Sequence, residues 1–355
     1  MYSISIVFES HKFMLIDNVF VRQTPFCIMH SKHWFQIMNT HCAAERICYI
    51  LPTSSSKNKL HEALASEHFE DASKFIRSQR EVHLVECFEE KDRCNVSCLH
   101  LIAAISDKEK ATELCRQLMQ NTRNPLNRDH LLYMRTIEKF DMGCGWDAQC
   151  PARVAAIHIA AYNGNSGVVR IMCQDYGIDV NCCFSETLEE KPKKDITPLE
   201  WAARKGHSAV VKVLVENNAN VNTARNTHGV TAVYIAAQNG HVDVVKMLLE
   251  YKADINASIH TDGTTALYIA AQNGHIDVVK TLLVNKADVN ASIHTGATVL
   301  YIAAEKGHVD VVKTLLENKA NVNASNHTDG ATSLYAAAWN GHVDIVKMLL
   351  ANNAV

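Results

Sequence analysis

The chain has 355 residues, of which 47% are hydrophobic and 21% are charged, so it holds enough apolar material for a large core. Its formal net charge of −3 at pH 7 gives no overall attraction to nucleic acid or to an anionic membrane, so we expect neither as a partner. Because no apolar run reaches the roughly 18 residues that a spanning helix needs, we also expect no membrane insertion.

The first segment, residues 1–57, matches none of the patterns found later in the chain. It lacks a basic lead-in and a small-residue cleavage site, so we expect no secretory signal peptide. It ends in "PTSSSKNK", which is typical of a loop or linker. We leave its fold unassigned, with a small cap and a partly disordered segment as the alternatives.

Residues 58–151 contain two stretches with the spacing of helix pairs. They are "LHEALASEHFEDASKFI" at 60–76 and "CLHLIAAISDKEKATELCRQLM" at 98–119. In the first stretch Glu67 occupies the place where the later copies have a glycine. An insertion at about 120–150 follows, and its "HLLYMRTIEKF" has a helix-like pattern.

Residues 152–355 are a regular repeat, interrupted by an insertion at about 182–194. The Gly-His pairs that begin at Gly206, Gly240, Gly274, Gly307 and Gly341 are 34, 34, 33 and 34 residues apart. Self-similarity at a fixed period of this length predicts an array of identical small units. One unit cannot bury the apolar faces of its own helices, so the units must stack.

The unit around "LYIAAQNGHIDVVKTLLVNKADVN" at 267–290 predicts two short helices joined by a tight turn. The hydroxyl of Thr265 can cap the first helix, and Ala270 and Ala271 are small enough for close packing. Gly274 can end that helix in a left-handed turn. Lys280 falls outside the apolar stripe of the second helix and is expected in solvent.

The wording of these units resembles the ankyrin-repeat family. The opening "TPLEWAARKGH" at 197–207 and the later "TAVYIAAQNGH", "TALYIAAQNGH", "TVLYIAAEKGH" and "TSLYAAAWNGH" carry the resemblance, each followed by a variant of "VDVVKxLL". The resemblance implies an all-α fold, an ankyrin-repeat solenoid of stacked helix-turn-helix units. We expect about eight units, of which the first two are divergent.

One family position is changed in this chain. Where the family usually has a histidine after Thr-Pro-Leu, four units have a tyrosine: Tyr234, Tyr268, Tyr301 and Tyr335. The favoured interpretation is a packing substitution copied by duplication. The alternative is a line of aromatic side chains that is available to a partner.

The resemblance also implies a function, namely binding of a partner protein on the concave face of the array. Candidate contact residues are those that vary where the packed positions stay constant. After the Ala-Ala pair these are Tyr162, Arg204, Gln238, Gln272, Glu305 and Trp339, and at the turn tips they are Lys193, Lys194, His228, Asp262, Thr264, His294 and Asp329. Lys205 and Arg204 form a basic cluster with Lys191, Lys193 and Lys194. This cluster either receives an acidic partner or is a solvated loop.

A modification is implied by the resemblance alone. In ankyrin proteins an asparaginyl hydroxylase can act on the asparagine that closes "Asp-Val-Asn". The matching positions here are Asn222, Asn256, Asn290 and Asn323. The alternative is that these side chains only satisfy the backbone of a turn.

No catalytic motif, cofactor loop or metal spacing is recognisable, so we expect a non-enzymatic scaffold without cofactor or metal. The 12 cysteines all lie at or before Cys183 without C-x-x-C spacing, which favours free thiols and a cytoplasmic protein. We expect a monomer with a protein partner. The alternative is a ubiquitin-ligase-type adaptor or host-directed effector, whose N-terminal segment recruits machinery or carries a catalytic activity.

Overall fold

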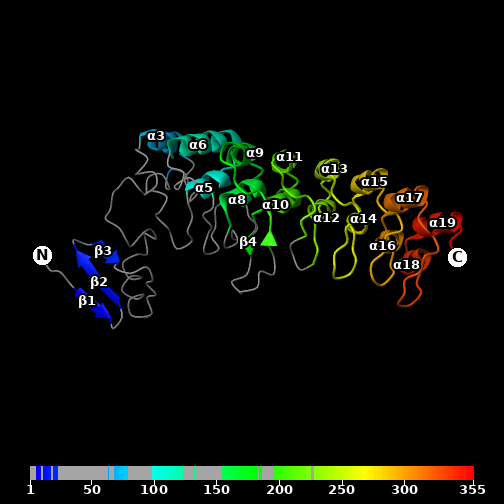
Figure 1. Ribbon diagram of the computed structural model, residues 1–355. Coiled ribbons are helices and arrows are strands. Elements are labelled where there is room, and N and C mark those ends of the chain that lie inside the picture. The colour runs from blue at the N-terminus through cyan, green and yellow to red at the C-terminus, as the bar shows by residue number, and fades with distance from the viewer. Residues whose placement is uncertain are drawn as a thin grey trace.

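The structure is a computed structural model that describes residues 5–8, 11–16, 19–22, 63, 68–78, 98–122, 132, 154–182, 184–185, 195–224 and 228–355. Within these residues short helices stack in single file along an elongated array (Figure 1). One row of the array consists of the first helix of each unit and the other row of the second helix. Long loops project beyond the row of first helices (Figure 1).

The helix bounds follow the repeat. The first helices are α5 (Cys98–Ala104), α8 (Ala156–Asn163), α10 (Pro198–Lys205), α12 (Ala232–Gln238), α14 (Ala266–Gln272), α16 (Val299–Lys306) and α18 (Ser333–Trp339). The second helices are α3 (Phe69–Ser78), α6 (Lys108–Asn121), α9 (Ser166–Arg170) with the π-helix η1 (Ile171–Asp175), α11 (Ser208–Glu216), α13 (Val242–Glu250), α15 (Ile276–Val284), α17 (Val309–Glu317) and α19 (Val343–Ala351).

Local chemistry sets these helix ends as the sequence predicts. The Thr265 hydroxyl accepts a hydrogen bond from the Tyr268 amide at 3.2 Å, so it caps α14. Gly274 follows α14 with a φ of 75°, a left-handed conformation that favours glycine. At α10 the cap is reciprocal, because Thr197 accepts from the Glu200 amide while the Glu200 carboxylate accepts from the Thr197 amide.

The core runs through the whole array between the two rows of helices. Ala270 and Ala271 of α14, and Val279 and Leu282 of α15, are fully buried, whereas Lys280 is exposed. α14 packs against α12 before it, α16 after it and its own α15. Burial of one such Val or Leu side chain contributes about 1.5–3 kcal/mol, and both neighbouring units are needed to provide it.

The divergent stretches belong to the same stack. α3 packs on α6, α5 packs on α8, and α6 packs on α9, so the contacts of the regular units continue toward the N-terminus. Cys98, Ile102 and Leu118 are fully buried in this part of the core. The second helix of the third unit departs from the others, since α9 widens into η1 at Ile171.

Among the described residues, strands occur at two places outside the helical array. At the second insertion β4 (Phe184–Ser185) pairs antiparallel with β5 (Asp195–Ile196). In the N-terminal segment β1 (Ser5–Phe8), β2 (His11–Ile16) and β3 (Val19–Arg22) form an antiparallel sheet in the order β1-β2-β3. The other residues of 1–57, and most of the insertions at about 120–150 and 182–194, lie outside the described residues.

Candidate functional site

A row of histidines ties each unit to the one before it. The Nε2 atoms of His207, His241, His275, His308 and His342 each donate to a backbone carbonyl of the preceding unit. The acceptors are the carbonyls of Tyr162, Arg204, Gln238, Gln272 and Glu305, at 2.8, 2.9, 3.0, 3.0 and 3.1 Å. These acceptors are the residues that follow the Ala-Ala pair. Stacking therefore uses only their backbone carbonyl and places no requirement on the type of side chain.

The side chains at this position differ in exposure. Arg204 and Gln238 are exposed, Gln272 and Glu305 are half-buried, and Trp339 keeps 77% of its surface exposed. The sixth candidate, Tyr162, is only 6% exposed and packs inside the stack. Five of the six candidates are therefore at least partly exposed on the first helices. We use the term recognition face for the first helices together with the loop tips, where the sequence predicts binding.

Tyr162 lies beneath a cluster contributed by α10. The ring of Trp201 meets it edge-on, with ring centroids 5.1 Å apart. The Lys205 ammonium lies 4.3 Å from the centroid of Tyr162, and the Arg204 guanidinium lies 5.3 Å from that of Trp201. The contribution of Trp201 to this cluster was not predicted from the sequence. Its position is isoleucine in most later units.

The loop tips are joined by backbone hydrogen bonds. The amides of His260, His294 and His327 donate to the carbonyls of His228, Asp262 and Thr295 at 2.7, 2.7 and 2.6 Å. The candidate side chains of His228, Asp262, His294 and Asp329 are all exposed. The candidate Thr264 is only 5% exposed, and its hydroxyl donates to the Asp262 carboxylate at 2.6 Å. The candidates Lys193 and Lys194 lie outside the described residues.

The comparisons with known proteins identify one family. A family model for ankyrin repeats matches the chain in three copies, at residues 60–225, 222–293 and 282–355. The chain belongs to the ankyrin-repeat family. A search of the curated proteins found no match.

The ankyrin match begins at residue 60 and confirms the predicted repeat solenoid, whereas the number of units stays a prediction. Ankyrin repeats generally mediate protein–protein interaction, which places this chain among interaction modules. In the described residues no helix is long and apolar enough to span a membrane.

The four tyrosines change from packed to open along the ankyrin array. Tyr234 is 9% exposed and Tyr268 is 6% exposed, Tyr301 is half-buried, and Tyr335 is 54% exposed. Burial, together with nearby Glu305 and Asp262, raises the pKa of Tyr268 to about 12. The packing interpretation fits the first two tyrosines, and only the last offers a broad surface.

The four asparagines proposed for hydroxylation connect successive ankyrin units. The Oδ1 atoms of Asn222, Asn256, Asn290 and Asn323 accept from backbone amides of the next turn, at 2.7, 3.0, 2.7 and 2.9 Å. These bonds give the asparagines a structural role. All four residues are exposed, and their hydroxylation stays a prediction.

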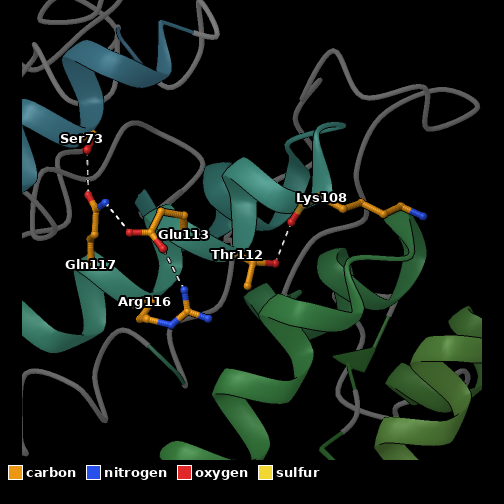
Figure 2. A network of polar contacts seen from close by, with 6 residues as sticks. All are labelled: Ser73, Lys108, Thr112, Glu113, Arg116 and Gln117. Atoms are coloured by element: carbon orange, nitrogen blue, oxygen red, sulfur yellow. Dashed lines mark hydrogen bonds and ion pairs between the residues drawn. The ribbon is translucent and has the colours of Figure 1, made fainter.

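A polar network and two buried thiols lie in the N-terminal part of the ankyrin stack. Between α3 and α6, Ser73 donates to Gln117, and Gln117 and Arg116 both donate to Glu113, each at 2.8–2.9 Å (Figure 2). Deeper in the core, burial raises the pKa of Cys115 and of Cys173 to about 12, so both thiols stay protonated at neutral pH.

Proposed function

We propose that the chain is a non-enzymatic scaffold that binds a partner protein on its recognition face, the concave side of the array. Arg204, Gln238, Gln272 and Glu305 would contact the partner from the first helices. The loop tips would add His228, Asp262, His294 and Asp329. The support for this proposal lies in the first helices, where the backbone carbonyl of the residue after the Ala-Ala pair joins two units while its side chain, from Arg204 to Glu305, stays at least partly exposed.

That division explains why these positions can vary. The histidine bond is made to a carbonyl, which every residue type supplies, so an arginine, a glutamine or a glutamate is equally compatible with stacking. The packed Ala-Ala pair beside them is buried from Ala202 and Ala203 to Ala303 and Ala304 and cannot vary in the same way, although Ala338 of the last pair is exposed. Selection for a partner can therefore act on the recognition face without loss of the fold.

The charges on this face are separated along the array. Arg204 and Lys205 lie on α10, whereas Asp262, Glu305 and Asp329 lie further toward the C-terminus. Lys306 pairs with Glu305 at 3.1 Å. A partner with an acidic portion facing α10 and a basic portion facing α16 and α18 would fit this arrangement and would bind in one direction only.

Binding can be tested in the full chain with Arg204, Gln238 and Gln272 changed to alanine together. Alanine favours helix and keeps the backbone carbonyls, so we expect a nearly unchanged unfolding midpoint. We expect captured partner to bind at least about tenfold more weakly, a loss of ~1.4 kcal/mol or more. The control is Lys280→Ala, an exposed change on the row of second helices.

The readout is affinity capture followed by a titration of the captured protein. Lost binding in the triple variant with retained binding in the control supports the proposal. Equal affinity of the triple variant and the unchanged chain would refute it and would direct attention to residues 1–57, which recruit machinery in the adaptor alternative.

A further inference from the structure

One edge of the array is formed by the turns between the first and the second helix of each unit. At this edge Lys108 begins α6, and Arg204 and Lys205 end α10. None of these three side chains forms an ion pair with another described residue. We term Lys108, Arg204 and Lys205 the cationic edge.

The turns that carry these cations are joined to one another. The Asn165 side chain donates to the Ile105 carbonyl at 3.0 Å, which joins the turn between α8 and α9 to the turn before α6. The His207 ring donates to the Tyr162 carbonyl at 2.8 Å, which joins the turn between α10 and α11 to α8. A single turn, between α8 and α9, therefore lies between Lys108 and the end of α10.

Lys108 points along this edge instead of joining the polar network of α6. The Thr112 side chain lies against Gly167 at the start of α9, and its hydroxyl donates to the Lys108 carbonyl one helical turn earlier. Figure 2 shows the Lys108 side chain extended away from Glu113. The Lys108 ammonium is therefore directed away from the carboxylate that Gln117 and Arg116 contact.

Positive charges from α6 and α10 act together at the His207 ring. Desolvation is the largest cause of the lowered pKa of His207, and the hydrogen bond to the Tyr162 carbonyl opposes it. Three charged groups come next and lower the pKa further: Lys108, His241 and Lys205. The cations of the two helices therefore lie close enough to this ring to act on it jointly.

Aromatic rings position the two cations of α10. The Lys205 ammonium lies 4.3 Å from the centroid of Tyr162, and the Arg204 guanidinium lies 5.3 Å from that of Trp201. A ring face attracts a cation without neutralising its charge, so both groups can still attract an anion. Arg204 and Lys108 are exposed and Lys205 is half-buried, so an anion from solution can approach all three.

The cationic edge coincides with the loss of an acidic position. In the later units the second residue of the second helix is an aspartate: Asp243, Asp277, Asp310 and Asp344. The equivalent residues of α9 and α11 are Gly167 and Ala209, and neither helix has an acidic residue in its first turn. An aspartate there favours a helix through the helix dipole, so its replacement gives up some local stability and leaves these turns without a carboxylate.

Acidic groups bound the cationic edge on both sides. On α6, Asp107 pairs with Lys110 at 3.4 Å, and Glu109 is exposed in the first turn. On α13, Asp243 is exposed. The positive stretch is therefore short, which suits a few carboxylates of a protein better than the long backbone of a nucleic acid.

We propose that the cationic edge binds an acidic segment of the partner protein, whose aspartate or glutamate side chains approach Lys108, Lys205 and Arg204. This inference rests on the proposed function, and it extends the contact surface from the recognition face at Arg204 to Lys108 on a divergent unit. Because the cations lie at an exposed edge, salt should weaken the attraction.

The test uses two fluorescent peptides of about 12 residues in a low-salt buffer, matched in everything except charge. The acidic probe carries several glutamates, and the neutral probe has glutamine at each of those positions. Fluorescence anisotropy with the full chain should show the acidic probe binding at least about tenfold more tightly than the neutral probe. This difference should shrink as salt is added.

Ala209→Asp restores the aspartate of the later units and so locates the binding. Ala209 is exposed in the first turn of α11, where an aspartate favours the helix, so the variant should fold. We expect it to bind the acidic probe at least about fivefold more weakly than the unchanged chain. Ala209→Asn introduces a side chain of similar size without the charge and should bind the probe as the unchanged chain does.

Lys108→Gln tests the contribution of α6. It should weaken binding of the acidic probe at least about threefold, because one of the three cations is lost. The control Lys280→Gln makes the same change in net charge at an exposed position on α15 and should leave binding unchanged.

Three results would overturn the inference: equal binding of the two probes, binding that survives both Ala209→Asp and Lys108→Gln, and equal effects of Lys108→Gln and Lys280→Gln. Single-stranded DNA of the same length that bound more tightly than the acidic probe, in a way that depends on Lys108, would also overturn it.

Failure of this inference can be told apart from failure of the proposed function. If the variant with Arg204, Gln238 and Gln272 changed to alanine loses the captured partner, while Ala209→Asp keeps both the partner and the acidic probe, only this inference fails. Retention of the partner by that triple variant would instead count against the proposed function.

Discussion

At the scale of single residues, stacking depends on a glycine in one unit and a histidine in the next. A Cβ on Gly274 would lie 2.7 Å from Cε1 of His308, and the same close approach recurs at Gly164, Gly206 and Gly307. A Cβ on Gly341 would meet nothing within 4 Å. The left-handed backbone and the histidine contact are therefore two separate reasons for glycine at this position.

The two reasons can be measured separately with Gly274→Ala and Gly341→Ala. Both residues have a φ of 75°, so each alanine should cost about 1 kcal/mol of left-handed strain. Gly274→Ala should cost a further ~1–3 kcal/mol because the His308 ring must move away from its carbonyl partner. Urea unfolding of the full chain gives the difference. Equal costs would show that the histidine contact does not constrain this position.

A second residue-scale prediction concerns pH. Desolvation of the half-buried His207 ring lowers its pKa below the usual 6.5, and this effect exceeds the opposing hydrogen bond to the Tyr162 carbonyl. The folded state then binds fewer protons than the unfolded state. Its contribution to stability is complete above pH 6.5 and is lost as the pH falls from there through the lowered pKa.

An NMR titration of the His207 ring measures this pKa directly, and a midpoint below 6.5 is expected. His207→Gln keeps a donor for the Tyr162 carbonyl but cannot titrate, so it should flatten the decline of unfolding free energy with acid. A midpoint at or above 6.5, or an equally steep decline in the variant, would contradict the assignment.

At the scale of elements, the junction between α6 and α9 tests whether the divergent unit is stacked as tightly as the regular ones. A Cβ on Gly167 would overlap the Thr112 hydroxyl and lie 2.8 Å from its Cγ2. That hydroxyl also donates to the Lys108 carbonyl at 2.6 Å (Figure 2). The two helices are therefore in direct contact through a side chain on α6 and a bare backbone on α9.

Gly167→Ala should reduce the free energy of unfolding by about 1–3 kcal/mol through this overlap. Adding Thr112→Ala removes the overlapping atoms and should restore most of the loss, as a double-mutant cycle in thermal or urea unfolding would show. A chain that tolerates Gly167→Ala, or one that Thr112→Ala does not rescue, would mean that α6 and α9 are not packed in this way.

The helices and strands also show which features of the structure could be predicted from the sequence. Thr265, Gly274 and the Ala-Ala pair were predictable because their roles are local or repeat with the period. The burial of Tyr162 was not, since it depends on Trp201 and Lys205 of the following unit, which break the consensus. β1 to β3 were missed although runs such as "VFVR" at 19–22 have the composition of strands. The repeat period predicts elements only within the repeated units, so it offered no guide to the strands of the N-terminal segment.

At the scale of the whole molecule, the array separates two tasks. The core between the two rows of helices and the row of histidines join the units, while the recognition face presents side chains that stacking leaves free. Stability in such an array is the sum of local terms, so a change on this face should not spread to distant units. The position of the partner on the array is therefore the central claim.

Hydrogen–deuterium exchange of the full chain, with and without its captured partner, tests that claim most directly. We expect new protection from exchange in peptides that include Arg204, Gln238, Gln272 and the loop tips, extending to Trp339. Peptides from α11, α13, α15 and α17 should show little change in exchange. Protection confined to those second helices, or to residues 1–57, would contradict the account.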